Sequence, residues 1–111
     1  MGFPERIELL GEVYTVRLVE QPRSDEDPTG VNGDLWGYIH FKRAEILVQD
    51  GATPQRQRVI LLHELLHGIE IEEVMSISLS EKQVTRLARA IDGLFAQNPD
   101  LVRLYLPDGD A

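Results

Sequence analysis

The chain has 111 residues, of which 42% are hydrophobic and 27% charged, and it contains no cysteine. These values are typical of one globular domain spanning residues 1–111, and any zinc in it must be held by nitrogen and oxygen ligands. The formal net charge of −8 argues against nucleic acid as a partner, because binding phosphates requires a basic face.

No apolar run reaches the length of a membrane span, and the N-terminus lacks the hydrophobic core of a signal peptide. We therefore expect a cytoplasmic protein without membrane association. Four arginines gather near the middle of the chain: Arg56, Arg58, Arg86 and Arg89. Because acidic residues are interspersed along the chain, we interpret these arginines as ordinary solvated surface rather than a basic patch.

The first half of the chain predicts short strands. Alternating apolar residues in 6–20, interrupted at Gly11, indicate two strands, and 35–41 and 44–48 indicate two more joined by a tight turn. The segment 21–34 between the two pairs is polar and rich in turn residues, so we expect a surface connection rather than a lid.

The second half predicts two helices, giving an α+β fold in which a small, mainly antiparallel sheet precedes the helices. The first helix should begin at Thr53-Pro54 and be buried on most sides. The second should begin with a capping box at Ser80 and end at Asn98-Pro99. Its expected apolar stripe comprises Val84, Leu87, Ala88, Ile91, Leu94 and Phe95. The apolar tail 101–106 is expected to pack back on the body.

The first of these helices contains His63-Glu64-Leu-Leu-His67, an H-E-x-x-H sequence. On an α-helix the two histidines lie about 40° apart in azimuth and about 6 Å apart along the axis, so both can bind one metal ion. Glu64 falls about 60° beyond His67, beside the metal and suited to act as general base for a zinc-activated water. The sequence thus predicts one Zn²⁺ per chain.

A catalytic zinc usually has three protein ligands, so a third must come from elsewhere. The downstream candidates are Glu70, Glu72, Glu73, Glu81 and Asp92. Glu70 shares the azimuth of the histidines, but it lies roughly 7–8 Å along the axis from a metal level with the middle of the pair, which suits it to supporting a ligand rather than being one. Periodicity leaves Glu81 as either a ligand or a residue that favours the helix dipole.

Residues 59–90 resemble the ImmA/IrrE-like metallopeptidases, especially their short phage and prophage members. The resemblance is carried by Leu-Leu-His-Glu-Leu-Leu-His and by Glu81-Lys-Gln-Val-Thr-Arg-Leu-Ala, although Val84, Thr85 and Leu87 stand where the family often has Ala, Asn and Phe. It implies a minimal gluzincin in which Glu81 is the third zinc ligand. For a phage-derived member it also implies the cytoplasm of a bacterial host.

These observations predict a zinc metallopeptidase that cuts a protein or peptide, with His63, His67 and Glu81 as ligands and Glu64 as base. The oxyanion stabiliser is left open among His40, Tyr38 and Tyr105. For His40, a solvent-facing strand position is the alternative. The strand at 44–48 is expected to hold an extended peptide as a sheet edge.

The alternative function is a zinc-containing binding or regulatory module without peptidase activity, or with latent activity. In that case the apolar tail would occupy the cleft as an inhibitory segment. Neither the substrate nor the oligomeric state follows from the sequence.

Overall fold

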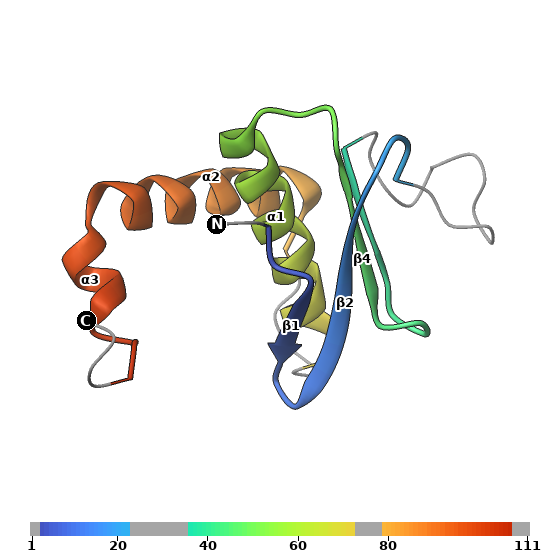
Figure 1. Cartoon of the computed structure of the whole chain (residues 1–111), viewed down its shortest axis with the longest axis horizontal. Helices are drawn as coiled ribbons and strands as arrows, with labels where there is room; N and C mark the ends of the chain where they lie inside the picture. Colours follow the sequence, from blue (N-terminus) through green and yellow to red (C-terminus); the bar gives the residue numbers. More distant parts are fainter. Residues whose placement is uncertain (1–2, 23–35, 73–78, 108–111) are drawn as a thin grey trace.

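The computed structural model describes residues 3–22, 36–72 and 79–107 (Figure 1). The elements are β1 (Arg6–Leu9), β2 (Glu12–Val19), β3 (Gly37–His40), β4 (Glu45–Gln49), α1 (Pro54–Glu72), α2 (Glu81–Gln97) and α3 (Pro99–Arg103). The chain is a small α+β fold, as expected. Most of the loop expected at 21–34 lies outside the described residues, and none of the described helices is long and apolar enough to span a membrane.

The sheet is mixed, with strand order β1-β2-β4-β3. β1 pairs with β2 and β3 with β4 in the antiparallel sense, but the central pair, β2 and β4, is parallel. The expectation of a mainly antiparallel sheet missed this central pairing. Because β4 is hydrogen-bonded on both sides, the prediction that residues 44–48 form a peptide-binding edge is wrong. The edges of this sheet are β1 and β3.

Gly11 is required by the turn that joins β1 to β2. Leu9 pairs with Glu12, so the turn consists of Leu10 and Gly11 alone. Both adopt positive φ, 50° for Leu10 and 92° for Gly11. Two-residue hairpins favour such mirror-image turns because their twist matches that of the strands, and glycine adopts positive φ without steric cost.

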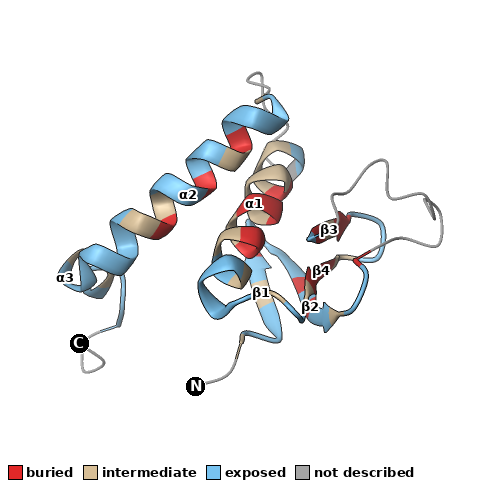
Figure 2. Ribbon diagram, turned by 90° about the horizontal axis from the view of Figure 1, so that it is seen from above, coloured by how far each residue is buried: buried red, intermediate tan, exposed pale blue. Residues whose placement is uncertain are grey.

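α1 lies between the sheet and α2, so the described part of the chain forms three layers (Figure 2). Its sheet-facing side contributes Ile60 and Leu61 to a core that includes Tyr14, Ile46 and Val48 of the strands. Thr53 begins the helix as expected, since its hydroxyl accepts a hydrogen bond from the backbone N–H of Arg56 at 3.2 Å. The layered arrangement leaves the other side of α1 for contact with α2.

α2 begins with the predicted capping box at Ser80 and packs on α1 through Val84 and Ala88. Its C-terminal half extends beyond α1, as Figure 1 shows, and Leu94 and Phe95 of that half are exposed. Leu87, in the N-terminal half, is exposed as well. The stripe prediction therefore holds for only part of the helix.

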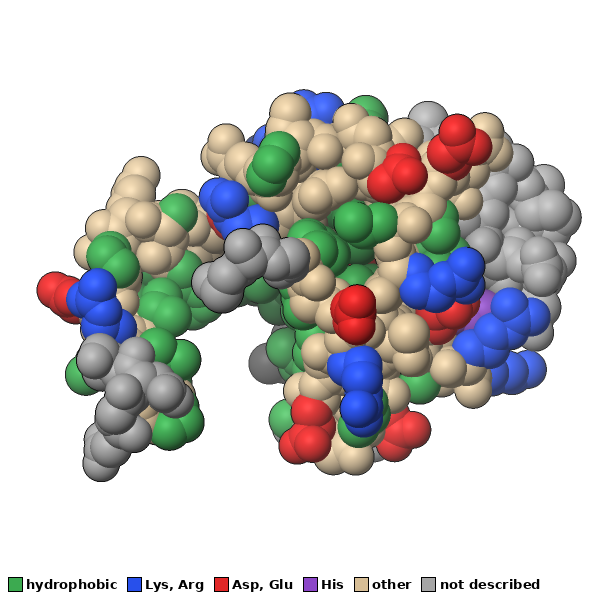
Figure 3. All heavy atoms as spheres, viewed as in Figure 1, with side chains coloured by type: hydrophobic (Ala, Val, Ile, Leu, Met, Phe, Trp, Pro, Cys, Tyr) green, Lys and Arg blue, Asp and Glu red, His purple; other side chains and the backbone are tan. Residues whose placement is uncertain are grey.

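The tail does not pack back on the body, contrary to the sequence-based expectation. α3 contacts α2 and no other described element, and Leu104 and Tyr105 are 79% and 80% exposed. Hydrophobic side chains line a hollow between this arm and the rest of the molecule (Figure 3). The apolar composition of the tail predicted its burial, but the tail follows the part of α2 that extends beyond α1 and therefore lies away from the core.

Gly68 allows α1 to approach the sheet closely. A β-carbon at this position would lie 2.5 Å from Cδ2 of Leu9 and 3.2 Å from Cδ1 of Ile39.

We expect Gly68→Ala to destabilise the protein by about 1–2 kcal/mol, because overpacking a core outweighs the helix propensity that alanine adds. Gly93→Ala in α2 is the matched control: its β-carbon meets nothing within 4 Å, so it should be neutral or stabilising. Urea denaturation would measure both, and equal effects would contradict the packing argument.

Candidate metal centre

Three side chains from two helices converge at the contact between α1 and α2. His63 and His67 project from α1 and Glu81 from the first turn of α2, and each offers one donor atom within 4.8 Å of the others. Nε2 of His63 lies 3.2 Å from Nε2 of His67 and 3.1 Å from Oε2 of Glu81, while Oε1 of Glu81 contacts Nε2 of His67. His63 is buried, His67 is partly buried and Glu81 is exposed.

Two of the distances between donor atoms are compatible with a shared tetrahedral metal ion. Ligand atoms about 2.0–2.1 Å from a tetrahedral zinc are separated from each other by about 3.3 Å. The two distances of 3.2 Å and 3.1 Å are close to this value. Two imidazoles and a carboxylate also form a donor set that zinc accepts, and they leave a fourth position open. The described residues therefore form a group that fits a metal ion such as zinc.

The opposite edge of each imidazole faces a group that can orient the ring. Nδ1 of His63 lies 3.4 Å from the hydroxyl oxygen of Thr85, and Nδ1 of His67 lies 3.3 Å from Oε1 of Glu70. A carboxylate beside Nδ1 favours the tautomer that carries its proton there, which would leave the lone pair of Nε2 toward Glu81. With the protons on both Nδ1 atoms, the Nε2 lone pairs of the two histidines and the carboxylate of Glu81 would point toward one another, an arrangement that favours a cation between them.

Glu70 has the supporting position predicted for it. Its Oε2 accepts a hydrogen bond of 3.1 Å from the backbone N–H of Leu79, just before α2. Its Oε1 is fully buried and, despite its 3.3 Å approach to His67, has no aligned hydrogen-bond donor among the described residues. Glu70 thus connects the orientation of His67 to the start of α2.

Thr85 was not singled out as a site residue by the sequence-based reasoning. It lies four residues after Glu81, on the same face of α2, and this i,i+4 spacing was the available signal. A threonine in an amphipathic helix has many other roles, however. Only the packing of α2 on α1 shows that its hydroxyl faces His63.

Asp92, another candidate ligand, forms an ion pair with Arg58 instead of joining the histidines. Its carboxylate is buried and accepts a 2.9 Å hydrogen bond from Nε of Arg58, an ion pair that joins α1 to α2 away from the histidines. The side chain of Glu72 and all of Glu73 lie outside what the structure describes. Among the candidates it does describe, only Glu81 joins the histidine pair.

Glu64, the predicted base, is buried between α1 and the sheet. It follows His63 directly and is only 4% exposed. Its carboxylate packs against Gly37 of β3, where an added β-carbon would lie 3.0 Å from Oε2 of Glu64. The absence of a side chain at Gly37 therefore makes room for this carboxylate between helix and sheet.

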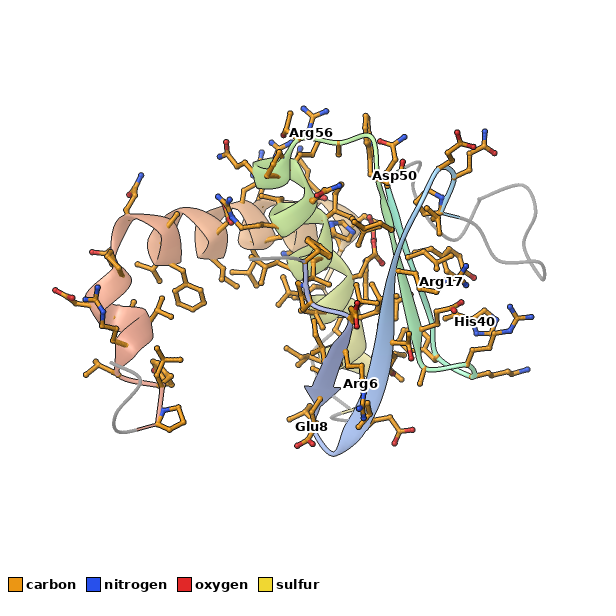
Figure 4. All side chains as sticks on the ribbon, viewed as in Figure 1. Arg6, Glu8, Arg17, His40, Asp50 and Arg56 are labelled. Atoms are coloured by element: carbon orange, nitrogen blue, oxygen red, sulfur yellow. The ribbon has the colours of Figure 1, made fainter. Side chains whose placement is uncertain are left out.

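The three candidate oxyanion stabilisers are not brought to the cluster. Gly37 and Ile39 of β3 face α1, so the alternating Tyr38 and His40 face the opposite side of the sheet. Figure 4 shows His40 beyond the sheet, away from α1. His40 is buried rather than solvent-facing, and its Nδ1 accepts a hydrogen bond from the backbone N–H of Arg43. Tyr105 lies beyond α3 on the projecting arm.

Comparisons of the chain with family models, with curated proteins and with solved structures gave no match. The chemical interpretation of the cluster therefore depends on its own geometry.

We expect the purified chain to bind one Zn²⁺, with His67→Ala and Glu81→Ala each lowering the affinity by more than about 100-fold, because each removes a direct ligand. Isothermal titration calorimetry would measure both stoichiometry and affinity. Glu12→Ala, an exposed acid on β2, is the control for loss of negative charge. Unchanged zinc binding in Glu81→Ala would refute the ligand assignment.

Glu70→Gln tests whether this carboxylate supports His67. The amide preserves the shape of the side chain but loses the charge that orients an imidazole N–H, so zinc affinity should fall about 10- to 100-fold without a change in stoichiometry. The same titration, with Glu8→Gln on β1 as an exposed control, would measure this. Equal affinities of the two variants would leave Glu70 a purely structural residue.

Proposed function

We propose that the protein is a zinc-dependent metallopeptidase that hydrolyses peptide bonds of a protein or peptide substrate. The observation that supports this most directly is the convergence of donor atoms from His63, His67 and Glu81 within metal-binding distance, with Glu64 adjacent in sequence and buried. The resemblance of residues 59–90 to the ImmA/IrrE-like metallopeptidases favours the same chemistry, in a short phage-type member acting in the cytoplasm of a bacterial host.

His63, His67 and Glu81 would hold the metal, while Thr85 and Glu70 keep the two imidazoles in orientation. Bound there, Zn²⁺ supplies Lewis-acid chemistry, lowering the pKa of water and polarising a carbonyl group. Glu64 accepts the proton of the attacking water at its carboxylate and later delivers it to the leaving amine. Its burial against Gly37 restricts the carboxylate to few orientations and limits its exposure to bulk water.

A latent form in which the tail covers the site receives no support from the described residues. Residues 99–103 form α3, which contacts α2 alone, and the residues after it up to Leu106 are exposed. The binding-module alternative therefore differs from the peptidase only in whether Glu64 performs chemistry.

Glu64→Gln separates these two functions. The substitution removes the base but none of the three metal donors, so we expect zinc affinity within a factor of about 3 of the original and hydrolysis slower by about 10²- to 10⁴-fold. Randomised decapeptides with blocked termini, analysed by mass spectrometry for new ends, would report cleavage. Glu8→Gln is the activity control. If the unaltered, zinc-loaded chain cuts no peptide and no unfolded protein, the peptidase proposal fails.

A further inference from the structure

A groove of about 720 Å³ runs between α1 and α2 and reaches the candidate metal centre. At one end it is lined by His63 and Thr85, both of which belong to the cluster region. Two contacts show that the helices are antiparallel. His63 contacts Thr85, and Arg58 pairs with Asp92. Arg58 precedes His63 in α1, whereas Asp92 follows Thr85 in α2. The groove therefore leads from the metal site toward the beginning of α1.

The far part of the groove is positively charged, although the chain as a whole carries −8. Arg56 of α1 and Arg89 of α2 both line it, and no carboxylate of the described residues forms an ion pair with either. Asp92, the acid of the lining, is already neutralised by Arg58. Two guanidinium groups that have no acidic partner within 3–22, 36–72 or 79–107 thus line a cavity that is continuous with the metal site.

Trp36 lines this part of the groove with a flat aromatic surface. The guanidinium carbon of Arg56 lies over the indole ring, 5.0 Å from its centre, and this cation–π contact favours that position of the cation. Val59 and Ile60 add apolar surface beside it. A stacked guanidinium keeps its N–H groups in the plane and can still donate two hydrogen bonds to one carboxylate.

The distance from the metal site sets the position of a ligand. Arg89 is four residues from Thr85, about 6 Å along α2, and Arg56 is seven residues from His63, about 10 Å along α1. An extended peptide advances about 3.3 Å per residue. A carboxylate about two or three residues from a bond held at the metal would therefore reach these arginines.

We infer that Arg56 and Arg89 select peptides with a carboxylate two or three residues from the cleaved bond. The carboxylate is supplied either by an aspartate or glutamate side chain or by the C-terminus of the peptide. This inference rests on the proposed function for the position of the cleaved bond, but binding in the groove does not require hydrolysis. It also gives a role to arginines that the sequence pattern alone indicated to be ordinary surface.

The test uses the chain's single tryptophan, Trp36, whose fluorescence reports occupancy of the groove. Three pools of randomised decapeptides are titrated into the Glu64→Gln chain, with and without Zn²⁺. One pool has an internal glutamate and an amidated end, one a glutamine and a free C-terminal carboxylate, and one a glutamine and an amidated end. Tighter binding of either charged pool, by about tenfold, supports the inference and identifies the source of the carboxylate.

Arg89→Gln and Arg56→Gln should remove this preference, whereas Arg89→Lys should retain part of it. Arg86→Gln is the matched control, because Arg86 is an exposed arginine of the same helix that does not line the groove. Equal binding of the charged and neutral pools would overturn the inference. So would an equal loss in Arg86→Gln and Arg89→Gln, because the preference would then reflect overall charge.

The failure of this inference can be distinguished from failure of the proposed function. If the unaltered chain cleaves peptides without preferring carboxylates, the peptidase proposal stands and the inference is wrong. If the charged pools bind through Arg89 but no peptide is cleaved, the groove is a carboxylate-binding site and the peptidase proposal is wrong.

Discussion

The antiparallel docking of α2 on α1 is the contact on which the candidate site depends. The two histidines belong to one helix and can be placed by its geometry alone, but Glu81 reaches them only because Val84 and Ala88 pack against α1. The capping box at Ser80 makes Glu81 the first residue of the helix. A glutamate one residue earlier or later in α2 would differ in azimuth by about 100° relative to this buried face.

The two sides of α1 have opposite chemical character, one apolar and one polar. One side joins the core through Ile60 and Leu61 and passes so close to the strands that glycine is needed at positions 37 and 68. The other side places two imidazoles beside a carboxylate. Burying such groups is unfavourable unless hydrogen bonds or a bound cation compensate for the water they lose. Thr85 and Glu70 provide contacts for the outer edges of the rings, while the inner edges converge where a cation would lie.

Local signals allowed α1, α2 and the histidine pair to be predicted from the sequence, whereas α3 was not predicted. Thr53-Pro54, the capping box and the four-residue histidine spacing each act within one or two helical turns, so no tertiary information was needed. Strand order is different: nothing local in 44–48 shows that β2 and β3 both pair with that strand. The misplacement of the oxyanion candidates has the same origin, because the side of the sheet that Tyr38 and His40 face depends on where α1 packs. Likewise, the tail's composition indicated burial but could not show that α2 extends beyond the core.

α2 contacts only α1 and α3 among the described elements, so it is attached to the body on one side. A metal ion shared by His63, His67 and Glu81 would therefore cross-link α1 to α2 as well as serve chemistry. By thermodynamic linkage, the free energy of metal binding would add to that of α2 docking and would be lost when α2 separates. The metal-free chain would then open locally at this helix before the sheet unfolds, and occupancy of the site would determine how rigidly the groove is held.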